Sequence, residues 1–359
     1  MKRVLLLVFL LLFLTLPVCA AEETGIDTDI LEQELPEEAE EIMPDISPEE
    51  DADFWGSAKS VLLRAIAKTD GSLQDGLRIC AILIAVVTLC AVADMSSSVG
   101  QYGGAVSAAG ALGMTAAFVG GFYAMVTMAQ ETIRSLTDYT ACLMPALAAA
   151  AAMSGSMTAA SALHAGTLLF SELLMQLICK LLIPGVFFYL SVATAEAALA
   201  SDALKELREF IGWLISKSLR IMVYVFLAFL SITGVISGTA DAVAIKTTKA
   251  AMSGMVPVVG GMLSDASETV LASASVIKNS IGVFGMIAVL SICILPFLRV
   301  GVQYLLLKAT AAVSGTVGLK QHVSLMKSYS AAMGYLLAMC GTCGLLLLIS
   351  CVCFIKAVA

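Results

Sequence analysis

Long apolar runs, separated by short polar stretches, make up most of the chain after residue 78. A helical run of about 20 apolar residues crosses a hydrocarbon core roughly 30 Å thick. The pattern therefore predicts an all-α, polytopic transmembrane helical bundle over residues 58–359. Eight spans are expected, near residues 79–94, 104–129, 139–158, 160–179, 181–200, 219–239, 281–307 and 331–355. The total falls to seven if 139–200 contains two spans rather than three, because the polar interruptions there are short.

The first 20 residues have the pattern of a secretory signal peptide. Lys2 and Arg3 precede an apolar core that ends at Leu16, and Val18-Cys19-Ala20 suits cleavage after Ala20. Two other interpretations remain open: lipid attachment at Cys19, and an uncleaved segment that anchors the chain. In each case we expect the acidic segment that follows to lie outside the cytoplasm.

Residues 21–57 form that acidic segment, with 15 of the chain's 28 Asp and Glu residues and no Lys or Arg. Self-repulsion and scarce apolar surface leave little to offset the entropy of ordering. The segment is therefore predicted to be a disordered extracytoplasmic tether. Binding of a basic partner or a divalent ion is an alternative to a simple solvated linker.

Two stretches have the apolar spacing of amphipathic helices. Between residues 54 and 77, apolar and basic positions alternate as in a helix that lies at a membrane surface. Between residues 201 and 218, apolar residues recur at steps of three and four, and charged residues cluster away from most of them. The second helix either lies among lipid headgroups or docks a cytoplasmic partner through Phe210, Trp213 and Leu214.

The stretch from Lys246 to Lys278 differs from a simple loop. Its apolar piece, residues 250–262, is too short to span a membrane and contains Pro257, Gly260 and Gly261. Non-helical backbone at membrane depth must meet its hydrogen-bonding needs from protein or water. The block is either a re-entrant or pore-proximal element or a surface hairpin. The residues that would form the element are Lys246, Lys249, Pro257, Gly260, Gly261, Asp265, Glu268 and Lys278.

Composition excludes a soluble enzyme, because 59% of the residues are hydrophobic and only 13% are charged. The net charge of −8 comes from the acidic segment: without it and the two N-terminal basic residues, 18 basic residues face 13 acidic ones, or +5. Short cytoplasmic loops are enriched in Lys and Arg. The basic loops at 201–218 and 308–330 are thus expected in the cytoplasm, with the mature N-terminus outside. Eight spans would place the C-terminus outside as well.

No residue set with catalytic, cofactor-binding or metal-binding spacing is found. His164 and His322 are far apart, and Cys340-Gly-Thr-Cys343 lies in an apolar run where thiols behave as small apolar side chains. Glu172 lies well inside an apolar run, so it either lines a functional interior or is a neutral, hydrogen-bonded structural acid. Tracts of Gly and Ala allow close helix packing, which a homo-oligomer also requires. Nothing predicts a nucleic-acid partner.

The sequence resembles the stage III sporulation protein AE family of endospore-forming bacteria. The resemblance rests on Ala244–Ala250, Val256–Ala266, Glu268-Thr-Val270 and Ile277-Lys-Asn279, and on the order of signal peptide, acidic spacer and spans. It implies a non-enzymatic protein of the mother-cell membrane around the forespore. It also implies a place in the apparatus that connects the two cells during engulfment and is needed for late forespore gene expression. Other stage III sporulation membrane proteins and an associated ATPase are the implied partners.

The residues themselves leave three classes of function. The first is a component of a multiprotein channel or secretion apparatus, and the second is a secondary transporter or permease with a broken helix at its substrate site. The third, an intramembrane enzyme, is disfavoured because no paired acids, no nucleophile with a base and no metal cluster occur. A transporter would be favoured by an internal repeat, and the two halves show no convincing one.

Overall fold

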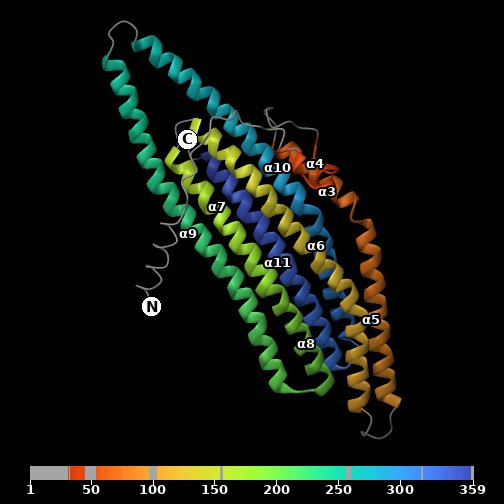
Figure 1. The fold of residues 1–359 in the computed structure, drawn as a ribbon. Helices are drawn as coiled ribbons and strands as arrows, with labels where there is room; N and C mark the ends of the chain where they lie inside the picture. Colours follow the sequence, from red (N-terminus) through yellow and green to blue (C-terminus); the bar gives the residue numbers. More distant parts are fainter. Residues whose placement is uncertain are drawn as a thin grey trace.

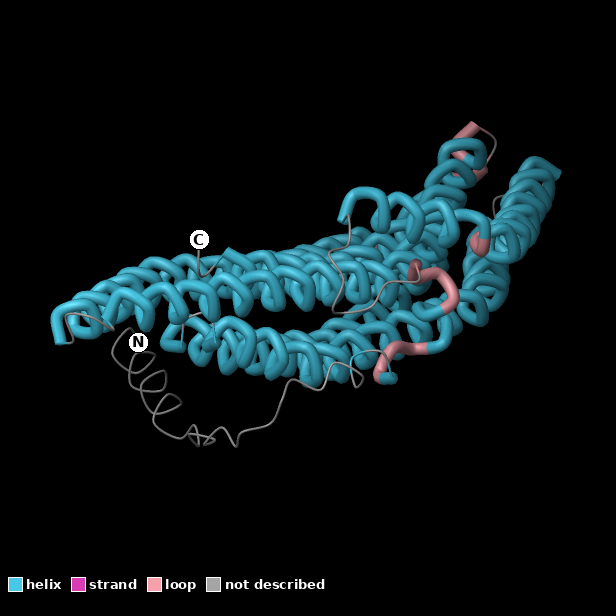
Figure 2. The backbone as a smooth tube through the Cα atoms, turned by 90° about the horizontal axis from the view of Figure 1, so that it is seen from above, coloured by secondary structure: helices cyan, strands magenta, loops and turns pink. Residues whose placement is uncertain are grey.

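The structure is a computed structural model that describes residues 31, 33–44, 54–96, 103–153, 157–255, 260–316 and 318–356. Only the backbone is described at residues 70, 95, 96, 103, 157–159 and 356, and over 232–255 and 260–278. All regular structure in the described part of the chain is helical (Figure 2). The fold-class prediction of an all-α protein is confirmed.

Long helices run side by side along one axis (Figure 1). The short α3 (Glu37–Glu40) and the amphipathic α4 (Phe54–Ala67) precede them. The long helices are α5 (Asp70–Ser96), α6 (Gly103–Met153), α7 (Met157–Leu177), the π-helix η1 (Ile178–Leu182), α8 (Ile183–Leu199), α9 (Asp202–Met255), α10 (Gly260–Ser314) and α11 (Lys320–Lys356). Six stretches among the described residues are long and apolar enough to cross a membrane.

The chain alternates between two ends of the bundle. We call the end where α8 turns into α9 the lower end; α5 and α10 also finish there, and α6 and α11 begin there (Figure 1). The upper end holds the C-terminal ends of α6 and α11 and the beginning of α7. The last part of α9 and the first part of α10 extend beyond it (Figure 1). Both basic regions predicted to be cytoplasmic, 201–218 and 308–330, thus begin or lie at the same end.

Six apolar stretches, rather than seven or eight, result from the absence of two expected turns. Residues 130–138 are polar, and we expected a connection between spans there, but α6 continues through them. Gln, Glu and Arg are good helix formers, and no Gly or Pro occurs in this stretch to end the helix. The expected boundary near residue 180 is likewise helical, because η1 joins α7 to α8.

The π-helix has a local cause in Pro184. Proline has no backbone N–H and its ring crowds the preceding helical turn, which normally breaks or kinks a helix. Here the Ile183 N–H bonds to the Ile178 carbonyl, one residue further back than in an α-helix. The wider turn accommodates Pro184 within the first turn of α8, so the chain continues in the same direction.

Part of the acidic segment that we expected to be disordered is folded. Ala39, Ile42 and Met43 are buried against the bundle, and α3 contacts α10. Ion pairs join Glu41 to Lys68 and Glu38 to Arg299. Three apolar residues spaced for one helix face, together with basic partners on the bundle, favour order where composition alone indicated none. The remaining residues of 21–57, apart from 31, 33–44 and 54–57, lie outside the described residues.

Candidate functional site

A partly buried ion pair lies near the lower end, between α8, α9 and α11. Arg208 Nε of α9 donates to Glu196 Oε2 of α8 over 2.6 Å, and the two side chains are only 14% and 13% exposed. Arg208 Nη1 lies 3.3 Å from Ser328 Oγ and 3.5 Å from the Tyr189 hydroxyl. Ser324 Oγ donates to Glu196 Oε1 over 3.4 Å. Each charge therefore has several polar partners, as a buried pair requires.

Further buried and partly buried polar side chains of α6, α8 and α11 lie near this pair. Thr115 of α6 lies 2.9 Å from Thr194 Oγ1 and 2.8 Å from the Tyr329 hydroxyl. Closer to the lower end, Ser107 Oγ bonds to Gln321 of α11 and, over 3.2 Å, to a carbonyl of α8. We call these residues and the ion pair the lower polar cluster; it consists of Ser107, Thr115, Tyr189, Thr194, Glu196, Arg208, Gln321, His322, Ser324, Ser328 and Tyr329.

His322 is the innermost ionisable member of the lower polar cluster. It is fully buried, and its Nε2 lies 3.1 Å from the Ser107 carbonyl oxygen, which can only accept, so Nε2 donates this hydrogen bond. Its Nδ1 has no partner among the described residues. A Cβ at Gly110 would lie 2.7 Å from the ring and 2.6 Å from Cys90 Sγ, so glycine permits this close approach of α6. The cluster holds both charges and spare hydrogen-bonding capacity.

The sequence did not single out this cluster. We expected 201–218 to be a separate connecting helix, but it forms the first turns of α9 and its Arg208 faces inward. Glu196 and Arg208 are 12 residues apart, on opposite sides of a tight turn. Ala200 has a left-handed φ of 52° there, and its N–H bonds to the Glu196 carbonyl. The one feature of the sequence that could have indicated the cluster is Glu196, a single acidic residue at the end of the apolar run 181–195.

The three residues predicted to dock a partner lie on the outer face of the same part of α9. Phe210, Trp213 and Leu214 are all exposed, and the Phe210 and Trp213 rings stack with centroids 6.0 Å apart. Ile211 and Ile215 face the bundle and are buried. The helix therefore presents apolar side chains in both directions, and the docking role of its outer face stays a prediction.

Glu172 lies on the surface of the bundle, not in its interior. Its Oε1 accepts a hydrogen bond from Gln176 Nε2 over 2.7 Å, and Lys180 Nζ donates to Gln176 Oε1 over 2.9 Å. Gln176 thus bridges the acid and the base, which are eight residues apart. These side chains form one wall of a groove of about 420 Å³, and α6 forms the other. The lining residues are Thr127, Gln130, Glu131, Arg134, Glu172, Met175, Gln176, Cys179 and Lys180.

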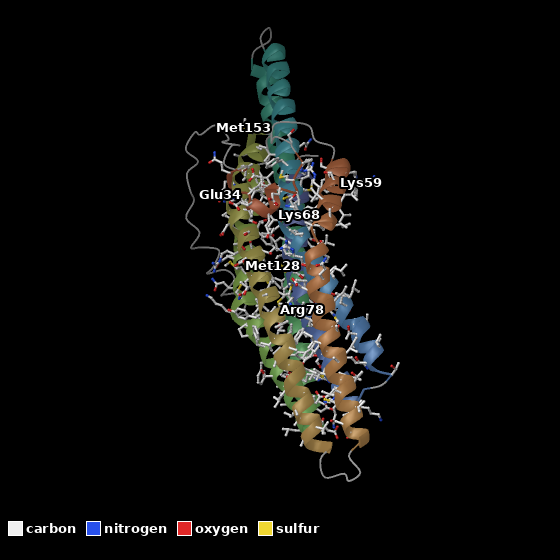
Figure 3. All side chains as sticks on the ribbon, turned by 90° about the vertical axis from the view of Figure 1, so that its right-hand side faces the viewer. Glu34, Lys59, Lys68, Arg78, Met128 and Met153 are labelled. Carbon is white, nitrogen blue, oxygen red and sulfur yellow. The ribbon has the colours of Figure 1, made fainter. Side chains whose placement is uncertain are left out.

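Charged side chains continue around the bundle at the level of this groove. Arg299 of α10 bonds to Glu38 of α3 and also approaches Met128 of α6. Met128 and Arg78 lie about halfway along the bundle in Figure 3. We call this zone the polar girdle; it consists of Glu38, Arg78, Gln130, Glu131, Arg134, Glu172, Gln176, Lys180 and Arg299.

The predicted re-entrant block falls at the ends of α9 and α10. α9 ends at Met255 and α10 begins at Gly260, so Pro257 lies in a stretch outside the described residues. Lys246 and Lys249 lie on α9, and Gly260, Gly261, Asp265, Glu268 and Lys278 lie on α10, in the part for which only the backbone is described. The helices on both sides of Pro257 extend beyond the rest of the bundle (Figure 1).

Comparison with known proteins decides the family. The sequence model of the family described as "Stage III sporulation protein AE" matches residues 40–358, which include all six apolar stretches. The chain belongs to the stage III sporulation protein AE family. Membership implies a role in sporulation. The match confirms the resemblance that the sequence motifs indicated.

One curated relative of this AE-family chain is the stage III sporulation protein AE of Bacillus subtilis (strain 168). It is 24% identical over 197 residues, which are 55% of this chain and 49% of the relative. The chain therefore matches about half the length of this relative. No solved structure matches the chain.

The AE family is not a known enzyme family. In the described part of this member, no three His, Cys, Asp or Glu side chains are grouped so that they would hold a metal ion. Cys340 and Cys343 are free thiols buried among apolar side chains of α11, as the apolar interpretation of the CxxC spacing expects. Among the side chains that the structure describes, the polar groups inside and around the bundle are concentrated in the lower polar cluster and the polar girdle.

Proposed function

We propose that this chain is a non-enzymatic membrane component of a multiprotein channel or secretion apparatus that connects the mother cell and the forespore. The observation that carries the proposal is the lower polar cluster, because ionisable side chains inside apolar helices are costly and generally mark a functional interior. The core of the described residues is filled with side chains. The chain therefore acts in this proposal as a part of an assembly and not as an open pore by itself.

The proposed orientation places the lower end in the cytoplasm of the mother cell. Lys205, Lys217, Lys320 and Lys327 are exposed in the lower half, which supports this orientation through the enrichment of basic residues on the cytoplasmic side. Because six apolar stretches return the chain to the upper end, the acidic segment and the C-terminus lie outside. Reporter fusions after residue 96, after residue 153 and at the C-terminus would test this. A cytoplasmic reporter signal at the C-terminus would contradict it.

The outer face of α9 is the proposed contact for a cytoplasmic partner, such as the associated ATPase. Aromatic side chains are enriched at protein interfaces, and Phe210 and Trp213 are exposed next to each other. Replacing both with Ser should reduce co-purification of sporulation partners at unchanged membrane level. Exposed Leu62 and Leu63 of α4 offer a matched control pair, for which we expect no loss. Equal co-purification of both variants would mean that α9 only lies at the membrane surface.

The upper tip of α9 and α10 is the proposed pore-proximal element. Gly260 and Gly261 follow Pro257 by three and four residues, and bulky side chains there would interfere with a backbone that, in this proposal, approaches other elements closely. Gly260→Leu and Gly261→Leu should abolish sporulation complementation without loss of membrane insertion, and Asp265→Ala should impair it more than Ser273→Ala. Full complementation by both leucine variants would leave the tip as a surface hairpin.

The experiment that tests the proposed function is complementation of a sporulating strain that lacks the chain. Late forespore gene expression should fail in its absence and return with the intact protein. Arg208→Met should restore it poorly, whereas Lys205→Met, on the exposed side of the same helix, should restore it fully. A secondary transporter is the alternative, favoured by the π-helical interruption η1 beside charged residues. Purified protein that transports a solute without any partner would favour that alternative.

A further inference from the structure

The groove between α6 and the α7–η1 segment contains charges of both signs. Arg134 and Lys180 supply positive charge, and Glu131 and Glu172 supply negative charge. Gln176 engages Glu172 and Lys180, but within the described part of the chain neither Glu131 nor Arg134 has an ion-pair partner. All four charged residues are exposed. The groove therefore has unused capacity for a ligand that carries both an anionic and a cationic group.

Large apolar side chains are exposed on the same helices directly below this groove. Val119 and Tyr123 of α6 lie within two to three turns of Thr127, and Leu181 and Phe188 follow Lys180 along the chain. Above the girdle, α6 exposes the smaller residues Ala141, Pro145 and Ala149 before Met153 near its end, while α7 exposes Leu169 and, beside Glu172, Leu173. On α6, the large exposed apolar side chains that suit contact with lipid therefore lie mainly below the groove.

The length of the lower half fits a bilayer. On α5, Arg78 and Asp94 are 94 − 78 = 16 residues apart, and no charged residue lies between them. On η1 and α8, Lys180 and Glu196 are 196 − 180 = 16 residues apart, again without an intervening charge. At 1.5 Å per residue each interval is about 24 Å. Arg78 and Lys180 are exposed and can extend toward the headgroups, which lengthens the apolar interval toward a core of roughly 30 Å, whereas Glu196 is paired with Arg208 inside the bundle.

The face of the upper half that contacts α3 and α4 does not suit hydrocarbon. Glu37, Glu38 and Glu40 of α3 and Lys59 of α4 are exposed there beside the exposed apolar residues Trp55, Leu63 and Ile66 of α4, a mixture typical of the headgroup layer, and α4 packs along α10. A charged side chain without a partner is costly within the hydrocarbon core. The level of the girdle therefore corresponds to the headgroup layer of the leaflet that faces the upper end.

We propose that this groove binds the headgroup of a zwitterionic phospholipid whose cationic group is a primary ammonium. The phosphate lies between Arg134 and Lys180, and the ammonium lies at Glu131 and Glu172. The acyl chains extend toward the lower end along the exposed apolar side chains of α6 and α8. This site requires only that the chain resides in a membrane; it does not depend on the proposed role in a channel.

Native mass spectrometry of purified protein tests the ligand. Delipidated protein is reloaded with phosphatidylethanolamine or with phosphatidylglycerol of the same acyl chains. We expect Arg134→Gln combined with Lys180→Gln to lower retention of phosphatidylethanolamine by about tenfold, because two charge-assisted contacts to phosphate are lost. Lys320→Gln combined with Lys327→Gln, exposed basic residues at the lower end, is the matched control and should retain the lipid. Equal retention by both double variants overturns the proposal.

The acidic pair provides the second test of the ligand. Intact protein should prefer phosphatidylethanolamine over phosphatidylglycerol, which lacks the ammonium. Glu131→Gln combined with Glu172→Gln should remove this preference while the total amount of retained lipid stays similar. Intact protein without any preference between the two lipids would overturn the assignment of the ammonium, and with it the zwitterionic ligand.

The depth of the bilayer is tested separately by fluorescence. The chain has two tryptophans, Trp55 and Trp213, and both are replaced by Phe for this experiment. Tyr123→Trp should then be quenched by lipids brominated in the acyl chains, whereas Ala141→Trp should not be quenched. Quenching of Ala141→Trp as strong as that of Tyr123→Trp would place hydrocarbon around the upper half and contradict the headgroup position of the groove.

Discussion

Two buried tyrosine hydroxyls, one in the lower half of the bundle and one in the upper half, differ in their hydrogen bonding. Tyr329 and Tyr139 are both fully buried. In the lower half the Tyr329 hydroxyl lies 2.8 Å from Thr115 Oγ1, whereas the Tyr139 hydroxyl, just above the girdle, has no partner among the described residues. The interior of the upper half is mostly apolar, with side chains such as Leu147, Phe284 and Met339 fully or almost fully buried, although a hydrogen bond between buried side chains there joins Thr167 Oγ1 to Ser350 Oγ over 3.3 Å.

This difference indicates what holds each half together. Between helices surrounded by lipid the hydrophobic driving force is small, and hydrogen bonds and close packing contribute most of the association. Where water surrounds the helices, burial of apolar area is the dominant favourable term. Polar contacts should therefore matter more in the lower half, and apolar volume should matter more in the upper half.

The largest effect is expected from Arg208→Met in the lower half. Glu196 would remain in a partly buried position with only Ser324 as a partner among the described residues, and breaking a buried ion pair in this way costs up to roughly 3–5 kcal/mol. Thermal unfolding in detergent measures the loss of stability. Lys205→Met, on the exposed side of α9, should change little, and adding Glu196→Gln to Arg208→Met should recover part of the loss. If Arg208→Met unfolds at the same temperature as Lys205→Met, the ion pair does not stabilise the lower half.

The second largest loss of stability is expected from Leu147→Ala in the upper half. It leaves a cavity in a tightly packed interior, and such substitutions cost about 3 kcal/mol. Leu112 lies on the same helix but is exposed in the lower half, so Leu112→Ala should remain within about 0.5 kcal/mol in detergent. Equal destabilisation by both substitutions would contradict the inference that apolar burial along α6 stabilises the upper half more than the lower half.

Tyr329→Phe should have a smaller effect. It removes the hydroxyl group that bonds to Thr115, and a typical intramolecular hydrogen bond contributes about 1 kcal/mol. The decrease in unfolding free energy can be followed by denaturant titration of the purified protein. Unchanged stability would show that the bond to Thr115 is energetically neutral.

The smallest effect is expected from the matched change Tyr139→Phe. The hydroxyl removed here has no partner among the described residues, so its loss relieves a cost of burial and should leave stability unchanged or raise it by up to about 1 kcal/mol. The same titration gives the comparison with Tyr329→Phe. A clear destabilisation of Tyr139→Phe would mean that its hydroxyl binds buried water, and the upper interior would then be less dry than we infer.

The sequence predicted the helical class, the apolar stretches and the amphipathic α4 because each depends on a periodic local pattern. It did not predict that α6 continues through Gln130–Asp138. There a decrease in hydropathy looked like a turn, although the residues are good helix formers. A decrease in hydropathy reflects the surroundings of a helix and does not by itself mark where the helix ends.

The site was predicted less completely. Glu172 was recognised from its position in an apolar run, but its exposure depends on which face of α7 meets α6. Glu196 and Arg208 lie on both sides of the turn at Ala200, and the sequence offered no sign that α9 turns Arg208 inward. The pairing depends on how three helices pack, which local spacing does not encode.

The uninterrupted length of α6 and α10 has a mechanical consequence. At 1.5 Å per residue, α6 with 51 residues and α10 with 55 residues are about 77 Å and 83 Å long, and each continues as a helix past an internal proline, Pro145 or Pro296. A tilt of the bundle by about 5° around its lower end would move the far tip by roughly 7 Å, more than one helical turn. A partner that binds the α8–α9 turn and tilts the bundle would thus displace the opposite end by more than one helical turn relative to a neighbouring protein.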